Sequence, residues 1–381
     1  MENQLPRRNF LLRSIGVVTT ALAYPIISFA DSIKNSGKSI NNTMNPIKAV
    51  KPLGFQWETS DPFLFCVHHE DAFPKGNENM GPDASYFQGR HMGDDFIIKD
   101  GFRMYHGKTV PGFPGHPHRG FETITVVRKG IVDHADSMGA AGRYGDGDVQ
   151  WMTAGKGVQH SEMFPLIHAD KDNTMELFQI WLNLPKKNKM VEPHFKMLWR
   201  ESIPNHKHTD GNGKQTVVEV IAGKLKDSIA PVPPPDSWAA DPKNEVAVWN
   251  IKMDSGAKFI IPKASDGVNR TLYFYEGTTL DVSGTKVNQY HAIELHANID
   301  IELTAAEASS ILLLQGKPIN EPVMQYGPFV MNTKQEINQA FEDYHKTQFG
   351  GWPWSRYDQV HARDKSRFAK HADGTMEIKN T

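Results

Sequence analysis

The sequence predicts an all-β fold with two domains, and three observations support this. The apolar runs are short and rich in β-branched and aromatic residues, as strands are. Turns that contain glycine or proline separate these runs, as in sandwiches and barrels. The chain has 381 residues, which is enough for two domains with ordinary hydrophobic cores. The clearest predicted strands are residues 123–127, 177–182, 217–221, 246–251, 271–275 and 311–314.

The first 30 residues have the features of an export signal. Arg7 and Arg8 lie in a segment that resembles the twin-arginine signal, and a modestly apolar run follows at residues 14–27. Small residues around Ala30 offer a cleavage site. The apolar run is shorter than the roughly 20 residues of a membrane span. We therefore expect a cleaved signal at residues 1–30 and no stable membrane span; an uncleaved anchor is the alternative.

This signal also predicts a location and a transient partner. The twin-arginine route carries folded proteins, often with a cofactor already inserted. We therefore expect the twin-arginine translocase to handle the chain during export and the mature protein to be periplasmic in a bacterium. Residues 31–47 are rich in serine, asparagine and lysine and have little to bury, so they are expected to form a flexible tether.

Charge and cysteine content exclude several classes of function. The formal net charge is −2 and the sequence pI is about 6.8, so the chain lacks the basic excess of a nucleic-acid-binding protein. Cys66 is the only cysteine. It can form neither an intramolecular disulfide nor a thiolate metal site, and a small buried apolar role is expected for it.

Two short motifs predict a metal site. His116 and His118 are spaced i, i+2, as are His160 and Glu162. Alternate side chains of a strand share a face, so each pair can present two ligands to one point. Pro117 biases His116 away from helical geometry. Three imidazoles and one carboxylate suit Fe, Mn, Co, Ni, Cu or Zn rather than Mg or Ca. Since the chain has 17 histidines, chance pairs of solvated side chains are the alternative.

A second carboxylate competes for the same role. Glu122 follows His118 by four positions and, on a continuous strand, would share a face with both His116 and His118. Spacing alone does not choose between Glu122 and Glu162.

Three segments resemble a known family. Residues 112–123 (GFPGHPHRGFET) and 147–163 (GDVQWMTAGKGVQHSEM) resemble the two metal-binding segments of the pirin family, within the cupin superfamily. Residues 321–333 (EPVMQYGPFVMNT) resemble the signature of the pirin C-terminal domain. The resemblance extends from about residue 61 to about residue 350.

The resemblance implies both the fold and the site. Pirins are bicupins, with two β-barrel domains of the double-stranded β-helix or jelly-roll type and a few peripheral helices. Their N-terminal barrel holds one divalent metal, usually Fe(II), and their C-terminal barrel has lost its ligands. The family's ligands fall on His116, His118, His160 and Glu162 here. Glu122 is then left either to support the metal ligands from behind or to make a structural hydrogen bond.

We divide the chain accordingly. The polar, glycine-containing segment 206–214 is the predicted boundary between a metal-binding domain at 48–205 and a C-terminal domain at 214–350. The first domain carries an insertion at about 65–111, which is either a lid or pocket wall near the metal site or a hairpin on the barrel exterior. A helix should begin after Thr333, which forms a capping box with Glu336.

Two further segments have no predicted chemistry. The tail at 351–381 is polar, and His291 and His296 are five positions apart, so they would face opposite sides of a strand. We expect these two histidines to be structural or solvated.

The resemblance also implies an activity. Pirins are similar to quercetin 2,3-dioxygenases, so we expect an oxidoreductase that opens a flavonol or related enol ring with O2. Glu162 would be both ligand and catalytic proton acceptor, and Phe113, Trp151 and Met152 would form pocket walls. The alternatives are an iron-dependent redox-sensing or partner-binding protein without turnover, and another metal-assisted reaction on the same scaffold.

Overall fold

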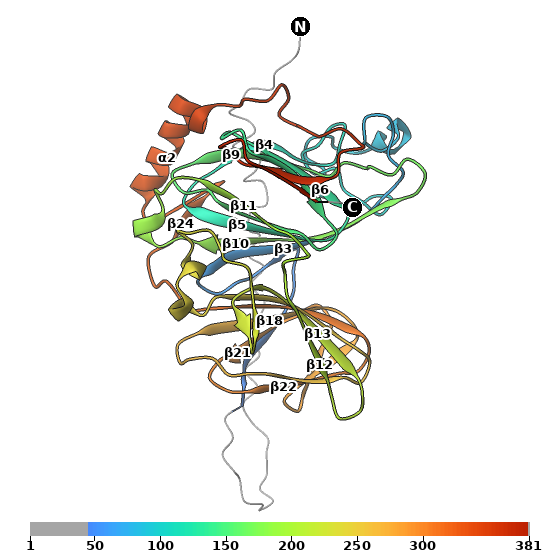
Figure 1. Cartoon of the computed structure of the whole chain (residues 1–381), viewed down its shortest axis with the longest axis vertical. Coiled ribbons are helices and arrows are strands. Elements are labelled where there is room, and N and C mark those ends of the chain that lie inside the picture. The colour runs from blue at the N-terminus through green and yellow to red at the C-terminus, as the bar shows by residue number, and fades with distance from the viewer. Residues whose placement is uncertain (1–44, 380–381) are drawn as a thin grey trace, which may run out of the picture.

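The computed structural model describes residues 45–379, which form two β-barrels stacked end to end (Figure 1). The predicted signal at 1–30 and most of the tether lie outside the described residues. Among residues 45–379, no helix is long and apolar enough to cross a membrane.

The N-terminal barrel consists of two six-stranded sheets, which we call the inner and outer sheets. The inner sheet has the order β11 (His194–Leu198), β8 (Val149–Thr153), β5 (Phe121–Lys129), β10 (Asn173–Asn183), β3 (Phe63–Phe73) and β2 (Gln56–Trp57). The outer sheet has the order β27 (Met376–Lys379), β26 (Arg367–Lys370), β7 (Ala141–Gly145), β6 (Ile131–Asp136), β9 (Val158–Met163) and β4 (Gly112–His118).

The C-terminal barrel has a larger and a smaller sheet. The larger has the order β1 (Ile47–Pro52), β21 (His291–His296), β18 (Asn269–Glu276), β23 (Ser309–Gly316), β16 (Ala247–Met253), β13 (Gln215–Ala222) and β12 (Asn205–Thr209). The smaller has the order β17 (Lys258–Ile261), β22 (Ile301–Ala305), β19 (Thr279–Val282) and β20 (Thr285–Asn288). Two ribbons complete the strands: β14 (Lys224–Leu225) with β15 (Ser228–Ile229), and β24 (Met324–Tyr326) with β25 (Phe329–Met331).

One α-helix, α2 (Lys334–Thr347), accompanies the described strands. Thr333 caps it as predicted, since the Glu336 amide donates to the Thr333 hydroxyl at 3.2 Å. Short 3₁₀ turns lie at η1 (Ala84–Phe87), η2 (Lys186–Asn188), η3 (Trp238–Ala240), η4 (Pro242–Asn244) and η5 (Gln348–Gly350).

An apolar layer joins the two barrels. The face of the inner sheet that points away from the N-terminal barrel packs on the larger C-terminal sheet, and Trp57 stacks on Tyr273 with ring centroids 5.1 Å apart. Cys66 lies in this layer, fully buried and unpaired, as the sequence predicted. One face of the inner sheet is therefore buried against the C-terminal barrel, and its opposite face lines the interior of the N-terminal barrel.

The strands at the two ends of the described chain each join the barrel that is more distant in sequence. β1 pairs with β21 of the C-terminal barrel, although it precedes the N-terminal domain in sequence. β26 pairs with β7 of the N-terminal barrel, so the expected polar tail ends as two strands. Both β7 and β21 would otherwise be sheet edges with unpaired backbone groups, and the terminal strands satisfy those groups.

Two internal segments also differ from expectation. The polar segment at 206–214, the predicted boundary, lies within the larger C-terminal sheet, because β12 and β13 form a hairpin across it. Residues 65–73 of the expected insertion are regular, because they belong to β3, which pairs with β10 through Phe73. The irregular segment therefore runs only from 74 to 111.

Candidate metal centre

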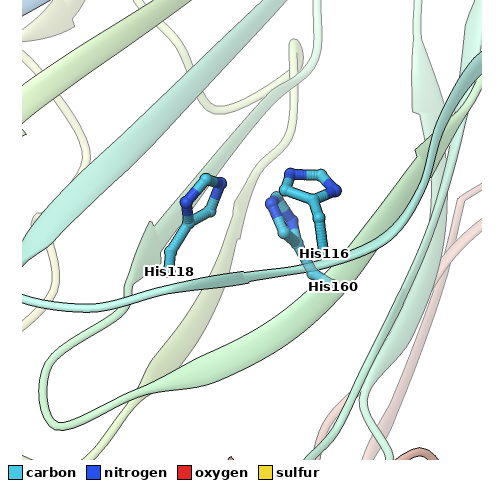
Figure 2. A group of neighbouring side chains, drawn as sticks. All are labelled: His116, His118 and His160. Atoms are coloured by element: carbon cyan, nitrogen blue, oxygen red, sulfur yellow. The ribbon is translucent and has the colours of Figure 1, made fainter. Parts of the chain in front are cut away.

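Antiparallel pairing of β4 and β9 brings three of the four predicted ligands together. His116 lies directly opposite His160, and His118 lies two residues further along the same strand. One ring nitrogen from each histidine lies within 4.8 Å of the other two. Figure 2 shows the three rings rising from two neighbouring strands on the same side. The i, i+2 spacing thus has the effect that the sequence predicted.

Hydrogen bonds to carbonyl oxygens fix the tautomers of two rings. His116 Nδ1 lies 3.0 Å from the Pro114 oxygen, and His118 Nδ1 lies 3.3 Å from the Pro328 oxygen. A carbonyl only accepts, so each Nδ1 carries the proton and each Nε2 keeps a lone pair for a metal. Burial lowers the pKa of His116 to about 4 and that of His118 well below its usual value, so both are neutral at pH 7.

His160 has the environment expected of a metal ligand. Its side chain is fully buried, and among residues 45–379 neither ring nitrogen has a hydrogen-bond partner. An unsatisfied buried polar group costs about 1–3 kcal/mol. Burial, followed by the nearby rings of His116 and His118, lowers the pKa of His160 well below its usual value. A neutral imidazole with unsatisfied nitrogens beside two other imidazoles fits a divalent transition metal.

Glu162 lies beside the three histidines, on the same strand as His160. Its Oε2 is 3.9 Å from His160 Nε2. Thr125 Oγ1 donates to Oε1 at 2.8 Å, and Gln179 Nε2 donates to Oε2 at 2.9 Å. Burial raises the pKa of Glu162 despite these bonds. The carboxylate is therefore oriented next to the histidine cluster, where it could serve as a fourth ligand or as a base.

The side chain of Glu122 lies on the face of the inner sheet that points away from the three histidines and toward the C-terminal barrel. Thr153 Oγ1 donates to its Oε1 at 2.6 Å, and Ser237 Oγ lies 2.5 Å from its Oε2, on the side of the C-terminal barrel. The expected shared face with His118 does not arise because the strand is not continuous. β4 ends at His118, Gly120 turns the chain with φ +85°, and β5 begins at Phe121. Glu122 thus makes structural hydrogen bonds away from the histidines.

A cavity of about 500 Å³ is lined by His116, His118 and Glu162, with His160 buried behind them. Phe113 lines it as expected, but Trp151 and Met152 do not, because both are fully buried elsewhere. Three parts of the chain contribute to the wall, namely the inner and outer sheets, the segment 74–111 and the C-terminal domain. The lining residues that do not come from the N-terminal sheets are Phe55, Asp94, Phe96, Ile97, His106, Phe164, Gln325, Gly327 and Pro328. The segment 74–111 therefore forms pocket wall and not an exterior hairpin.

Several polar residues around the site were not predicted. Thr125 and Gln179 hold Glu162, and they lie on strands of the inner sheet, whereas Glu162 lies on the outer sheet. His134 is fully buried with its ring centroid 5.5 Å from that of His160, and Gln150 lies 3.0 Å from its Nδ1. The only sequence signal is the polar character of these positions within otherwise apolar strands.

Comparisons with known proteins agree with this geometry. Residues 77–182 match the family model for pirin, and residues 248–350 match that for the pirin C-terminal cupin domain. A pirin-like protein of Caulobacter vibrioides is 35% identical over 269 residues, which cover 70% of this chain and 90% of that protein. The chain belongs to the pirin family. The predicted bicupin architecture and family resemblance are thereby confirmed.

Other pirin relatives carry functional names. Human pirin is 34% identical over 265 residues, which cover 68% of this chain and 83% of that protein. A Pseudomonas aeruginosa protein, provisionally named a quercetin 2,3-dioxygenase, is 36% identical over 259 residues, which cover 66% of this chain and 85% of that protein. The crystal structure of a quercetin 2,3-dioxygenase from Acinetobacter baumannii superposes with a TM-score of 0.62 at 28% identity, covering 81% of this chain and 99% of that one.

Proposed function

We propose that this pirin is a metal-dependent dioxygenase that opens the ring of a flavonol or a related enol with O2. The observation that carries the proposal is His160, whose buried, unpartnered nitrogens lie beside His116 and His118, two neutral imidazoles that line a cavity of about 500 Å³. That volume suits a ligand of drug-like size. The names of the P. aeruginosa and A. baumannii relatives support the choice of substrate class.

The chain's own residues would divide the work as follows. His116, His118 and His160 hold the metal, for which iron is the first expectation and Mn, Co, Ni, Cu and Zn are compatible with the donor set. A bound divalent transition metal would supply Lewis acidity and access to O2 chemistry. Glu162 accepts the proton of the enol hydroxyl, and its raised pKa makes it a better base than an exposed carboxylate.

Aromatic side chains would position the substrate. Phe113, Phe164 and Trp181 line the cavity next to the histidines. Their flat faces suit the planar rings of a flavonol and keep water from the reacting carbon atoms. Thr125 and Gln179 hold the Glu162 carboxylate in place while it takes the proton.

Metal analysis and oxygen uptake on one sample test the proposal. We expect about one transition metal per chain, and uptake of O2 that depends on quercetin and releases carbon monoxide. His160→Ala should lose both the metal and the uptake, whereas His208→Ala, a half-buried position on the C-terminal barrel, should keep both. Bound metal without uptake would contradict the dioxygenase and favour the redox-sensing or partner-binding alternative.

We further propose that the protein is exported by the twin-arginine route. The proposal rests on Arg7, Arg8 and the apolar run that follows them, all outside the described residues. Cell fractionation should find the native chain in the periplasm and Arg7→Lys/Arg8→Lys in the cytoplasm. Equal export of the two would contradict the proposal.

A further inference from the structure

A second polar cluster borders the cavity, away from the three histidines. It consists of His69 and Asp71 from β3, and Arg103 and Tyr105 from the segment 74–111. All four side chains are buried. His69 lines the cavity, so it is the member of the cluster that can meet a ligand.

The donor and acceptor of each hydrogen bond in the cluster can be assigned, starting from Asp71. Arg103 donates to both oxygens of Asp71, from Nε at 3.0 Å and from Nη2 at 3.1 Å, and its backbone amide donates to Oδ1 at 2.8 Å. A carboxylate with these donors only accepts, so the Tyr105 hydroxyl, 2.5 Å from Oδ2, donates its proton there. The phenolic oxygen is then left as an acceptor.

This assignment fixes the tautomer of His69. His69 Nδ1 lies 2.8 Å from the Tyr105 oxygen and must donate to it. His69 Nε2 therefore carries a lone pair, and within the described part of the chain the only hydrogen bond of the ring is the one at Nδ1. Burial, followed by the charge of Arg103, lowers the pKa of His69 well below its usual value. The ring thus presents a neutral acceptor.

The segment 74–111 holds Tyr105 in a strained conformation. Its φ of +57° lies in the left-handed region, which is unfavourable for a bulky side chain. Reciprocal backbone hydrogen bonds of 2.9 Å between Tyr105 and Asp95 maintain it, and Arg90 in turn donates to Asp95 at 2.8 Å. Strain of this kind persists only where the surroundings fix it, and it often marks a functional position.

The cluster lies one aromatic ring away from the metal centre. The ring centroid of Phe113 is 6.0 Å from that of His69 and 6.3 Å from that of His116. A planar molecule lying along Phe113 would therefore reach the histidine triad at one end and His69 at the other. Such a ligand would need one polar group for the histidine triad and a second, separate polar group for His69.

We propose that His69 is a specificity-determining residue that accepts a hydrogen bond from a second hydroxyl group of the substrate, distant from the hydroxyl that reaches the metal centre. Tyr105 is its positioning residue, since it acts through the ring of His69. The substrate class is thereby narrowed to enols whose other rings carry hydroxyl groups. This inference rests on the proposed flavonol-type substrate.

Anaerobic binding tests the inference without turnover. Isothermal titration would compare quercetin with 3-hydroxyflavone, which keeps only the enol hydroxyl. The wild-type protein should prefer quercetin, and His69→Phe should reduce that preference about fivefold to tenfold, the value of one hydrogen bond. His68→Phe is the matched control, because His68 points to the opposite face of β3 and stacks on Phe178. An unchanged preference in His69→Phe, or none in the wild type, would overturn the inference.

Two further variants separate recognition from folding. Tyr105→Phe removes the hydroxyl that orients His69 but keeps the buried ring, so it should reduce the preference while thermal unfolding remains cooperative, as for a folded protein. In the His69→Phe background the same change should have no further effect on the preference. Additive effects would overturn the positioning role.

Oxygen uptake by the same proteins distinguishes the two proposals. If the proposed function holds, His69→Phe should raise KM for quercetin and leave kcat near the wild-type value. A quercetin preference that depends on His69, without uptake by any protein, would support the binding site and contradict the dioxygenase.

Discussion

Two buried glutamates, Glu122 of the inner sheet and Glu162 of the outer sheet, differ in role because their side chains point to different regions of the protein. Burial raises the pKa of both. Glu162 points into the barrel next to His160, whereas Glu122 points to Ser237 at the domain interface. Residue type and burial therefore do not identify the carboxylate that can serve the histidine cluster. The direction in which each side chain points distinguishes the two.

The first prediction concerns metal content. Glu162→Gln should lower it well beyond Glu122→Gln, because only Glu162 lies within 3.9 Å of a histidine of the cluster. We expect at least a tenfold loss of affinity if Glu162 is a ligand or orients one. Elemental analysis of the two purified variants checks this. The reverse order would return the carboxylate role to Glu122.

The second prediction concerns the pH dependence of stability. Burial raises the pKa of Glu122 to about 7, above the value near 4.5 expected in the unfolded chain. The folded state then holds a proton that the unfolded state releases, so stability falls as pH rises from about 4.5 to about 7. The loss approaches about 3 kcal/mol by linkage.

Glu122→Gln removes this dependence, since an amide does not titrate. Thermal denaturation at pH 5 and pH 8 should show the variant gaining stability relative to the wild type at the higher pH. A constant difference between the two proteins across this range would contradict the raised pKa.

Sequence could predict the histidines but not their supports. His116, His118 and His160 were predictable because spacing within one strand fixes a shared face. Thr125 and Gln179 were not, because their contact with Glu162 depends on which strands face each other across the barrel. The parity argument for Glu122 failed at Gly120, where the chain passes from one sheet to the other.

At the scale of elements, the segment 74–111 has an anchored base and an exposed tip. Asp71 and Asp95 fix its base through buried arginines. Ile97 and Ile98 at the tip are 81% and 59% exposed, yet Ile97 also lines the cavity. Exposed apolar side chains at the mouth of a cavity suggest contact with a ligand.

The third prediction tests that contact. Ile97→Ser/Ile98→Ser should leave the free energy of unfolding within about 0.5 kcal/mol of the wild type, because both side chains are exposed. Flavonol affinity should fall about fivefold through lost apolar contact. Ile260→Ser, at a 56% exposed site on the other barrel, is the control. Equal affinities in all three proteins would exclude a role for the tip.

The pairing of terminal strands was beyond sequence reasoning. β1 and β26 are short, and their partners β21 and β7 lie more than two hundred residues away. Local pattern carries no information on which distant edge a short strand will cover. β3, in contrast, was hidden because His68, His69, Glu70 and Asp71 interrupt its apolar character.

At the scale of the whole molecule, the C-terminal domain contributes contacts to the candidate metal centre, although the three histidines come from the N-terminal barrel. The Pro328 oxygen accepts from His118 Nδ1, and Arg119 pairs with Asp343 of α2 at 2.7 Å. Val330 also donates its amide to the Arg119 oxygen at 3.0 Å. Figure 1 shows α2 lying along the N-terminal barrel rather than on the barrel that precedes it in sequence. The orientation of one histidine therefore depends on how the two domains dock.

Lys189 links the two domains and therefore allows a test of their docking. Its buried ammonium donates to the Gly120 oxygen and Asn183 Oδ1, both at 2.7 Å, and to the Val330 oxygen at 3.2 Å. Lys189→Met keeps the apolar stem but leaves these three buried acceptors without their donor. We expect a loss of about 3 kcal/mol in the free energy of unfolding.

Metal affinity should fall in the same variant, because Gly120 and Val330 flank the contact between His118 and Pro328. Exposed Lys187→Met, on the same turn, should change neither quantity. Chemical denaturation and metal titration measure the two effects separately. Lost stability with unchanged metal affinity would show that the docking of the C-terminal domain supports the fold without orienting His118.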